Sequence, residues 1–526
     1  MENKKQTVRL SNYSSSPFQI DEVKLTFRLS PENTTVLSKL SIIRLKKNID
    51  LKLDGKCLIL KSVKIDQKPV SFSKLSIESE HLEIPHNLIP NRRFSLEIET
   101  KINPSQNTSL EGLYISSGIY CTQCEAEGFR KITYFLDRPD IMARFYTRIE
   151  SSLTTLLSNG NIINFGKGFA EWYDPWPKPS YLFALVAGNL ATFEDHFITG
   201  SGRKILLKIF SKDKGEIKFS HAMESIKKAM RWDEKVYGRE YDLDIFMIVA
   251  VDDFNMGAME NKGLNIFNTK YIVANPDTAT DTDYQFIERI IAHEYFHNWT
   301  GNRITCRDWF QLSLKEGLTV FRDQEFAGDM GNKSIKRIED VITLKTRQFR
   351  EDDGVLAHPV RPSEYIEINN FYTSTVYEKG AELVRMLQLL VGEEKFKKAM
   401  GLYFEKWDGK ACTIEDWLGV FKEISTINID QFLLWYVQKG RPVLEVSENF
   451  ENGKYKLIFI QYFPNQNDKE LVEPMIIPVK ASIYSKDGKE VVSDQLLICD
   501  GKESVFDFTG FSEKPITSLL RDFSAP

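Results

Sequence analysis

The chain has 526 residues, of which 42% are hydrophobic and 27% are charged, so its composition is that of a globular protein and excludes extended disorder. This length predicts about three domains, and 69 Lys and Arg against 74 Asp and Glu give a net charge of −5, which indicates no basic surface for nucleic acid. No stretch approaches the ~18 apolar residues of a membrane helix, and residues 1–9 contain no apolar leader segment, so we expect neither a membrane nor a secretory protein.

The six cysteines are too few for a disulfide framework in so long a chain. Cys121 and Cys124 form a CxxC pair, but no second CxxC completes a four-thiolate metal site. We therefore expect six ordinary buried or half-buried thiols and a cytoplasmic location.

Residues 1–193 are expected to form a β-rich domain. The stretch 22–29 alternates apolar and polar residues, and Asp54-Gly55 between two short apolar runs predicts a hairpin. Gln123 and Glu125 follow in a stretch that, from its own residues, indicates only a surface loop.

Residues 194–440 change to long helical patterns that follow strands. The apolar run at 244–251 predicts a buried strand, and it leads directly to Gly257-Ala258-Met259-Glu260-Asn261. Gly257 allows a close backbone approach, whereas the preceding Met256 would by itself suggest packing.

The motif His293-Glu294-Tyr295-Phe296-His297 is the strongest chemical signal in the chain. Two histidines four residues apart on a helix point from one face and can bind a single zinc ion. Glu294 between them is placed to accept a proton from water at that ion. An isolated HExxH also occurs by chance, so the motif alone leaves metal binding open.

The residues before this motif support a helix. Thr282 and Gln285 predict a capping box at its start. Phe286, Ile290 and the two histidines then fall along one stripe of the helix.

A third ligand is expected at Glu316, since two histidines leave a tetrahedral zinc ion short of one protein ligand if water takes the fourth position. Glu316 lies near the start of the next predicted helix, with residues 298–315 between it and His297. Ser313 and Glu316 could instead form a capping box, but the upstream HExxH favours a ligand. Asp323, further along the same face, is either a partner of a ligand histidine or a solvated surface charge.

Residues 441–526 return to strand alternation. The stretch 455–461 and a hairpin signal at Asp487-Gly488 predict a small β-sandwich. The predicted fold class is therefore multidomain α+β, with an N-terminal β domain at 1–193, a catalytic domain at 194–440 and a β-sandwich at 441–526.

HExxH followed by a glutamate at this distance resembles the zinc signature of the gluzincin metallopeptidases. Residues 257–261 resemble the GAMEN exopeptidase motif of the zinc aminopeptidases in that group, and 121–140 and 293–326 are similar to the matching strings of its bacterial members. The resemblance runs from near residue 17 to the last residue. It implies a thermolysin-like catalytic domain and release of N-terminal residues from peptides with broad specificity, Ala, Arg and Lys being favoured.

The same resemblance implies the site. One Zn²⁺ would be held by His293, His297 and Glu316, with Glu294 as the general base and Tyr377, in the first turn of a helix, donating to the oxyanion. Glu125 and Glu260 would hold the free α-ammonium of the substrate, which an internal peptide lacks, and Met256 would line the pocket for the first side chain. The implied substrate-binding set is Gln123, Glu125, Met256, Gly257, Ala258, Met259, Glu260 and Asn261.

One departure from the family concerns the end of the chain. Bacterial members continue into a large helical C-terminal domain that covers the active site, and this sequence stops where that domain should begin. We expect a monomer whose partners are peptide substrates with a free N-terminus, and we expect no nucleic-acid or membrane partner. Whether the chain is active depends on whether the active site needs the helical domain to be complete.

Three other functions are compatible with parts of this pattern. A thermolysin-like endopeptidase would share the zinc residues but lack the motif at 257–261. An epoxide hydrolase of the leukotriene A4 type has Gly-Gly at the start of that motif, so Ala258 argues weakly against it. A non-enzymatic binding module would usually have lost zinc ligands or the base, and none is lost here.

Overall fold

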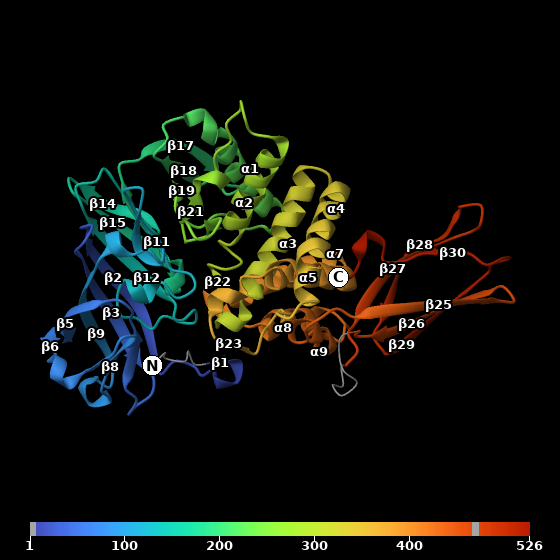
Figure 1. The fold of residues 1–526 in the computed structure, drawn as a ribbon, viewed down its shortest axis with the longest axis horizontal. Coiled ribbons are helices and arrows are strands. Elements are labelled where there is room, and N and C mark those ends of the chain that lie inside the picture. Colours follow the sequence, from blue (N-terminus) through green and yellow to red (C-terminus); the bar gives the residue numbers. More distant parts are fainter. Residues whose placement is uncertain (1–6, 465–472) are drawn as a thin grey trace. The chain divides into compact units, whose positions relative to one another are not determined.

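The computed structural model describes residues 7–464 and 473–526, which fall into two compact units (Figure 1). The larger unit comprises residues 13–309 and 407–412, and the smaller unit comprises the described parts of residues 1–12, 310–406 and 413–526. Residues 1–6, on which part of the leader argument rests, lie outside the described residues. In the part of the chain that is described, no helix has the length and apolar character needed to cross a membrane. The predicted domain boundaries at 193 and 440 stay a prediction.

The N-terminal part of the larger unit is built on β-sheets, as predicted. Strand β2 alternates buried and more exposed positions along its length, because successive side chains point to opposite faces of a sheet. In spatial order, the largest sheet contains β14 (Asn161–Gly166), β15 (Phe169–Lys178), β12 (Ala143–Glu150), β2 (Phe18–Arg28), β3 (Thr34–Arg44), β9 (Arg93–Ile102), β5 (Ile59–Ile65) and β6 (Lys68–Pro69). A four-stranded sheet contains β10 (Gly112–Ser116), β11 (Ile119–Gln123), β16 (Leu185–Gly188) and β13 (Thr155–Ser158).

The hairpin predicted at Asp54-Gly55 is wrong. Strand β4 (Leu51–Asp54) pairs with β8 (His81–Ile84) in a small sheet that β7 (Ser76–Ile77) completes, whereas β5 pairs with β9. A Cβ on Gly55 would lie 2.2 Å from the ring of Tyr134. The glycine therefore serves close packing against an aromatic ring, which a local turn pattern does not distinguish from a hairpin.

A five-stranded sheet forms the rest of the larger unit, with β19 at its centre, and helices α1 (Ser220–Tyr237) and α2 (Asp281–Phe296) pack side by side next to it (Figure 1). All seven residues of β19 are buried between the parallel strands β18 and β21, which confirms the buried strand. The sheet contains, in order, β17 (Ala191–Ile198), β18 (Lys204–Ser211), β19 (Ile245–Val251), β21 (Leu264–Asn268) and β20 (Ala258–Met259). A short parallel pair, β22 (Ile304–Cys306) and β24 (Lys410–Cys412), follows α2.

Helix α2 begins at a different cap from the predicted one. Thr280 is the N-cap, and its side chain and that of Asp283 form a reciprocal capping box with each other's backbone N–H groups. The predicted pair, Thr282 and Gln285, lies inside the helix. Two threonines with a polar residue three positions later compete here, and the start at Thr280 also brings Asp281 and Asp283 into the first turn, where the helix dipole favours negative charge.

The smaller unit combines helices with a β-sandwich. Its helices are α3 (Ser313–Met330), α4 (Lys333–Thr343), α5 (Phe349–Asp352), α6 (Gly380–Val391), α7 (Glu393–Trp407, whose last residue belongs to the larger unit), α8 (Ile414–Ile424), α9 (Ile429–Phe432) and α10 (Leu434–Val437). One sheet contains β25 (Val443–Glu451), β26 (Lys454–Tyr462) and β29 (Glu503–Thr509), and the other contains β28 (Glu490–Cys499), β27 (Ile477–Tyr484) and β30 (Ile516–Ser518). Strands β1 (Val8–Arg9) and β23 (Glu364–Tyr365) form a further pair.

The sandwich and its hairpin agree with the sequence. Strands β27 and β28 pair from Tyr484 and Glu490 onward, and Gly488 in the connecting turn has φ +80°, a conformation that favours glycine. The predicted hairpin at Asp487-Gly488 is therefore confirmed.

Two glycines allow α3 and α6 to approach closely. A Cβ on Gly317 would lie 2.7 Å from Ser313 Oγ and 2.8 Å from the backbone carbonyl carbon of Gly380. Since backbone cannot move aside as a flexible side chain can, this crossing requires glycine, and it fixes the start of α3, where Glu316 lies.

We expect Gly317→Ala to lower the free energy of unfolding by about 1–3 kcal/mol, because the added methyl group overpacks a tight helix crossing. The matched control is Gly401→Ala in α7, where a Cβ would meet nothing within 4 Å and where alanine should stabilise the helix by up to about 1 kcal/mol. Denaturant unfolding of the two variants measures the difference. If the two substitutions changed the free energy of unfolding equally, the claim that the crossing of α3 and α6 requires glycine would be wrong.

Candidate active site

The two histidines of the HExxH motif converge. His293 lies in the last turn of α2 and His297 is its C-cap residue. Their Nε2 atoms are 3.0 Å apart, with ring centroids 4.6 Å apart and ring planes at 86°. The predicted pairing of both imidazoles on one face is therefore observed within the larger unit.

The stripe of Phe286, Ile290 and the two histidines is not the face through which α2 packs into the core. Phe286 is 46% exposed and Ile290 is half-buried, whereas Ile287, Ile291 and Tyr295 are buried. The helix therefore packs through the neighbouring face and leaves the histidine face accessible at its start.

The protonation of His297 follows from its hydrogen bond. Its Nδ1 lies 2.9 Å from the carbonyl oxygen of Thr300, which can only accept, so Nδ1 donates and, in the neutral ring, the lone pair is on Nε2. Gly301 makes this geometry possible: its φ is +150°, and a Cβ there would lie 2.9 Å from His297 Nδ1. A neutral imidazole whose Nδ1–H is held by a hydrogen bond is the state in which histidine binds a transition metal through Nε2.

Glu316 carries a carboxylate, which is the kind of group that completes a ligand set begun by two imidazoles. Within the smaller unit Glu316 is buried in the first turn of α3 and forms a short ion pair with Lys315. The alternative capping box is wrong, because Ser313 lies inside α3 and its hydroxyl donates instead to the carbonyl of Val376, 2.8 Å away.

That hydrogen bond ties the start of α3 to the segment that carries Tyr377. Tyr377 is half-buried in a π-helical turn, Thr375–Lys379, that leads into α6, and not in an α-helical first turn. Turns of this kind are frequent at functional sites. Asp323 is buried, so its interpretation as a solvated surface charge is wrong.

Gln123 and Glu125 do not form a surface loop. Gln123 ends β11 and is 3% exposed, and Glu125 is 8% exposed. The Gln123 side-chain amide donates to the carbonyl of Glu125, and Gly128, whose Cβ would lie 2.3 Å from the carbonyl oxygen of Gln123, folds the loop tightly. Phe129 anchors the loop in the core, where its ring packs 5.4 Å from that of Phe183.

Glu125 and Glu260 form a pair of buried carboxylates in the larger unit, which we call the amine clamp. A carboxylate oxygen of each lies within 4.8 Å of one on the other, and Glu260 is 4% exposed. Like charges this close and this buried repel one another unless a cation lies between them. An ammonium group is such a cation.

The predicted GAMEN segment lies at the edge of a sheet. Ala258 and Met259 form β20, the last strand of the five-stranded sheet, so one side of it has no neighbouring strand in that sheet. Gly257 and Met256 are half-buried, and a Cβ on Gly257 would meet only the ring of Tyr271, at 3.4 Å. An edge of this kind can pair with an extended peptide.

A buried polar network beyond the amine clamp was not predicted. The Lys262 ammonium lies 2.5 Å from Asp242 Oδ2 and 2.6 Å from Asn298 Oδ1, and Arg303 donates to the same Asp242 oxygen at 2.8 Å. Burial lowers the pKa of Lys262; it would raise the pKa of Asp242, but the Lys262 ammonium and the Arg303 guanidinium outweigh it and hold that pKa below its ordinary value. The sequence contains no local signal for this network, because the partners of Asn298 and Arg303 lie more than 30 positions away from them.

Burial disfavours the thiolate form of the two cysteines in the CxxC pair. Burial raises the pKa of Cys121 to about 12 and that of Cys124 well above its ordinary value, so neither supplies a thiolate. Five of the six cysteines are buried, but Cys57 is exposed, which corrects the expectation for that residue.

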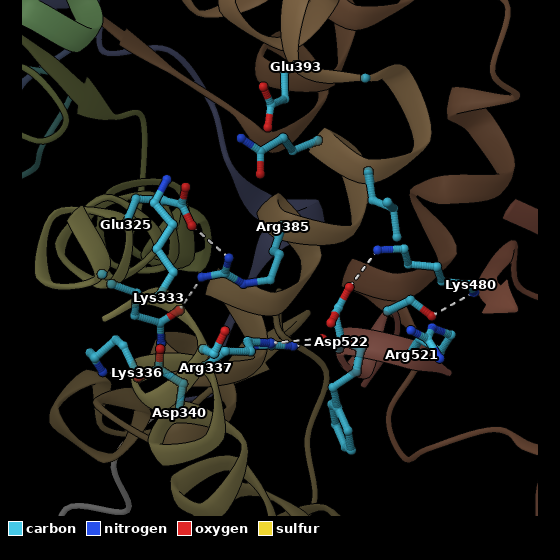
Figure 2. Close-up of a pocket in the computed structure, with 18 residues that line it drawn as sticks. Glu325, Lys333, Lys336, Arg337, Asp340, Arg385, Glu393, Lys480, Arg521 and Asp522 are labelled. Atoms are coloured by element: carbon cyan, nitrogen blue, oxygen red, sulfur yellow. Dashed lines mark hydrogen bonds and ion pairs between the residues drawn. The ribbon is translucent and has the colours of Figure 1, made fainter. Parts of the chain in front are cut away.

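A separate cavity of about 380 Å³ lies in the smaller unit, between α3, α4, α6 and residues 521–524 (Figure 2). Its basic groups are matched by carboxylates: Arg385 bonds Glu325 at 2.7 Å, and Lys480 bonds Asp522 at 2.5 Å. None of the predicted site residues lines it.

Models of known protein families match three parts of the chain. The Peptidase family M1 domain matches residues 221–436, the Peptidase M1 N-terminal domain matches residues 11–182, and a domain of unknown function with an Ig-like fold matches residues 440–526. The chain therefore belongs to peptidase family M1.

Its relatives within that family are aminopeptidases. The chain is 49% identical to aminopeptidase N of Haemophilus influenzae and 47% identical to aminopeptidase N of Escherichia coli, in each case over 98% of this chain. The crystal structure of Legionella pneumophila aminopeptidase A in complex with aspartic acid superposes with a TM-score of 0.89 at 34% identity, covering 99% of this chain and 60% of that one. The chain spans 61% of the length of the two aminopeptidase N relatives.

We expect Gly301→Ala to weaken metal binding by about 10- to 100-fold, because the added methyl group displaces the ring that Thr300 orients. Gly202→Ala is the control, since Gly202 also has a positive φ, +88°, but open space around it. Competition of each variant with a chromogenic zinc chelator measures the affinity. An unchanged affinity in Gly301→Ala would show that the Thr300 hydrogen bond does not orient the ligand.

Proposed function

We propose that this chain is a zinc-dependent aminopeptidase that releases N-terminal residues from peptides. The observation that carries the proposal is that one unit contains both the converging His293 and His297 Nε2 atoms and the buried amine clamp. The first can bind the ion that activates a peptide bond, and the second can bind the charged end of a peptide.

The proposed metal site consists of His293, His297 and Glu316, one Zn²⁺ per chain. Two imidazoles and one carboxylate are a ligand set of catalytic zinc sites, and the tautomer of His297 leaves its Nε2 ready to bind. Zinc bound there would polarise the scissile carbonyl and lower the pKa of its water from about 15.7 towards about 7.

The remaining chemistry belongs to side chains of this chain. Glu294, buried between the two histidines, accepts the proton of the attacking water and delivers it to the leaving amine. The Tyr377 phenol donates to the oxyanion that forms on the substrate. Loss of such a donor typically lowers turnover by about 10²–10³-fold. The similarity of the chain to aminopeptidases supports these two roles.

Specificity for a free N-terminus follows from the amine clamp. Glu125 and Glu260 hold the α-ammonium, Gln123 lies beside Glu125, and residues 257–261 pair with the substrate backbone along the open edge of β20. Met256 lines the pocket for the first side chain, for which we propose a broad preference with Ala, Arg and Lys favoured. A thermolysin-like endopeptidase would not require two carboxylates at this place, Ala258 argues against the epoxide hydrolase, and the complete ligand and base set argues against a binding module.

We further propose that the protein acts in the cytoplasm, as a monomer, on peptides and not on nucleic acid or membranes. Six cysteines are too few for a disulfide framework in a chain of 526 residues, which accords with a reducing compartment. The net charge of −5 gives no support for a nucleic-acid partner.

The test is hydrolysis of L-alanyl p-nitroanilide compared with its N-acetylated form, with the zinc content determined on the same sample. We expect cleavage of the free-amine compound only, and its loss on treatment with a chelator. Cleavage of both compounds would indicate an endopeptidase and contradict the amine clamp. Bound zinc without cleavage of either would contradict an aminopeptidase activity of this chain.

The Glu294→Gln variant separates metal binding from proton transfer. It keeps the shape of the side chain but cannot accept the proton, so zinc should stay bound while turnover falls by at least about 10²-fold. Turnover close to that of the unaltered protein would show that another group acts as the base.

A further inference from the structure

Two segments that are distant in the sequence meet beside the proposed site in the larger unit. One is the turn at residues 298–303, which directly follows the ligand His297. The other is the segment 260–262, which carries the clamp residue Glu260. The fixed spacing of these two segments sets how far the amine clamp lies from the two histidines.

Asn302 connects them most directly. Its backbone N–H donates to the carbonyl of His297 at 2.9 Å, and its side-chain amide donates to the carbonyl of Glu260 at 2.9 Å. Asn302 is 3% exposed. One buried residue thus joins the backbone of a proposed zinc ligand, through its own backbone N–H, to the backbone of a clamp residue, through its side chain.

Asn298 makes a second connection. Its Oδ1 accepts from the Lys262 ammonium at 2.6 Å, and its Nδ2 donates to Asp242 Oδ1 at 3.2 Å. Lys262 and Asn298 are 1% and 3% exposed. Buried polar groups have few alternative partners, so these bonds hold the two segments at one spacing.

The far side of the segment 260–262 is also fixed. The side-chain amide of Asn159 donates to the carbonyls of Lys262 and Leu182, and its oxygen accepts from the N–H of Ala184. The segment is therefore hydrogen-bonded on one side to the turn at 298–303 and on the other side to Asn159.

We propose that Asn298, Asn302 and Lys262 are positioning residues that fix the distance between the amine clamp and the metal ligands, and so select substrates whose amine lies on the α-carbon. This inference rests on the proposed function. None of the three touches the reacting atoms. Their role is to hold Glu260 where an α-ammonium reaches it while the scissile carbonyl lies at the metal site.

A loosened spacing has a specific consequence. A misplacement of about 1 Å can lower turnover by about 10²-fold, and the loss is largest for the substrate that fits the original distance. A β-alanyl compound carries its amine one methylene further from the scissile carbonyl. Loosening should therefore harm the α-alanyl substrate more than the β-alanyl one.

The experiment compares kcat/KM for L-alanyl and β-alanyl p-nitroanilide in the zinc-loaded protein and in Asn298→Ala and Asn302→Ala. Thr100→Val is the matched control, because the buried Thr100 hydroxyl also donates one hydrogen bond, of 3.1 Å, to a backbone carbonyl in the same unit. Thermal unfolding and zinc content are measured for each protein, as is the affinity for L-alaninamide and β-alaninamide by calorimetry.

We expect each asparagine variant to retain zinc and to lose the preference for the α-alanyl over the β-alanyl compound by about tenfold or more. In Thr100→Val the preference should stay unchanged even if the unfolding temperature falls. Asn298→Ala leaves in place the Lys262–Asp242 ion pair and the bond from Asn302 to the carbonyl of Glu260. If Asn302→Ala does not fold, the ratio of kcat/KM for the α-alanyl and β-alanyl compounds in Asn298→Ala therefore decides the test.

An unchanged preference in folded, zinc-loaded asparagine variants would overturn the inference and leave the proposed function intact. If the unaltered protein cleaves neither anilide, the proposed function fails, and the ratio of the two amide affinities then decides the inference alone. A lower ratio of the affinity for L-alaninamide to that for β-alaninamide in the asparagine variants than in Thr100→Val supports the inference. An equal ratio in the three variants overturns the inference.

Discussion

The hydrogen bond from His297 Nδ1 to the carbonyl of Thr300 is the interaction on which the site depends. It selects the tautomer of the neutral His297 ring, holds that ring with its Nε2 3.0 Å from His293 Nε2, and is possible only because Gly301 carries no Cβ. A helix supplies two histidines on one face for geometric reasons alone. The turn after the helix orients one ring of that pair, His297, in the way that the proposed zinc site requires.

The same turn links the chemistry to substrate recognition. Its two asparagines bond the backbone carbonyl of Glu260 and the ammonium of Lys262, so the turn that follows the proposed ligand His297 also contacts the segment of the proposed amine clamp. A buried ion pair such as Lys262–Asp242 contributes little net stability, because the loss of hydration offsets most of the attraction. In the proposed account its role is to fix one arrangement of two segments, which an exopeptidase would require.

Local patterns in the sequence were sufficient where a single element decides the outcome. The i, i+4 spacing of His293 and His297, the apolar run of β19 and the Asp487-Gly488 hairpin needed no tertiary information. Local patterns gave wrong predictions where the same sequence pattern is compatible with two different structures. Thr280 and Thr282 both allowed a cap, and the glycine at position 55 served an aromatic contact with Tyr134 and not a turn.

Other features could not be predicted because they arise from long-range contacts. The burial of Gln123 and Glu125 depends on the tight loop at Gly128 and on Phe129 in the core, so their own sequence indicated only a loop. The resemblance to a family supplied what the local chemistry did not. It marked Glu125 and Glu260 as a pair, and within the larger unit their carboxylates do lie close together.

X-ray absorption at the zinc edge of the loaded protein tests the central claim most directly. The proposed site predicts one zinc ion with two imidazole nitrogens at about 2.0–2.1 Å and oxygen neighbours at about 2.0–2.2 Å, and with the imidazole signal halved in His297→Ala. A shell with sulfur at about 2.3 Å, or one without imidazole, would place the ion elsewhere in the chain and contradict the account.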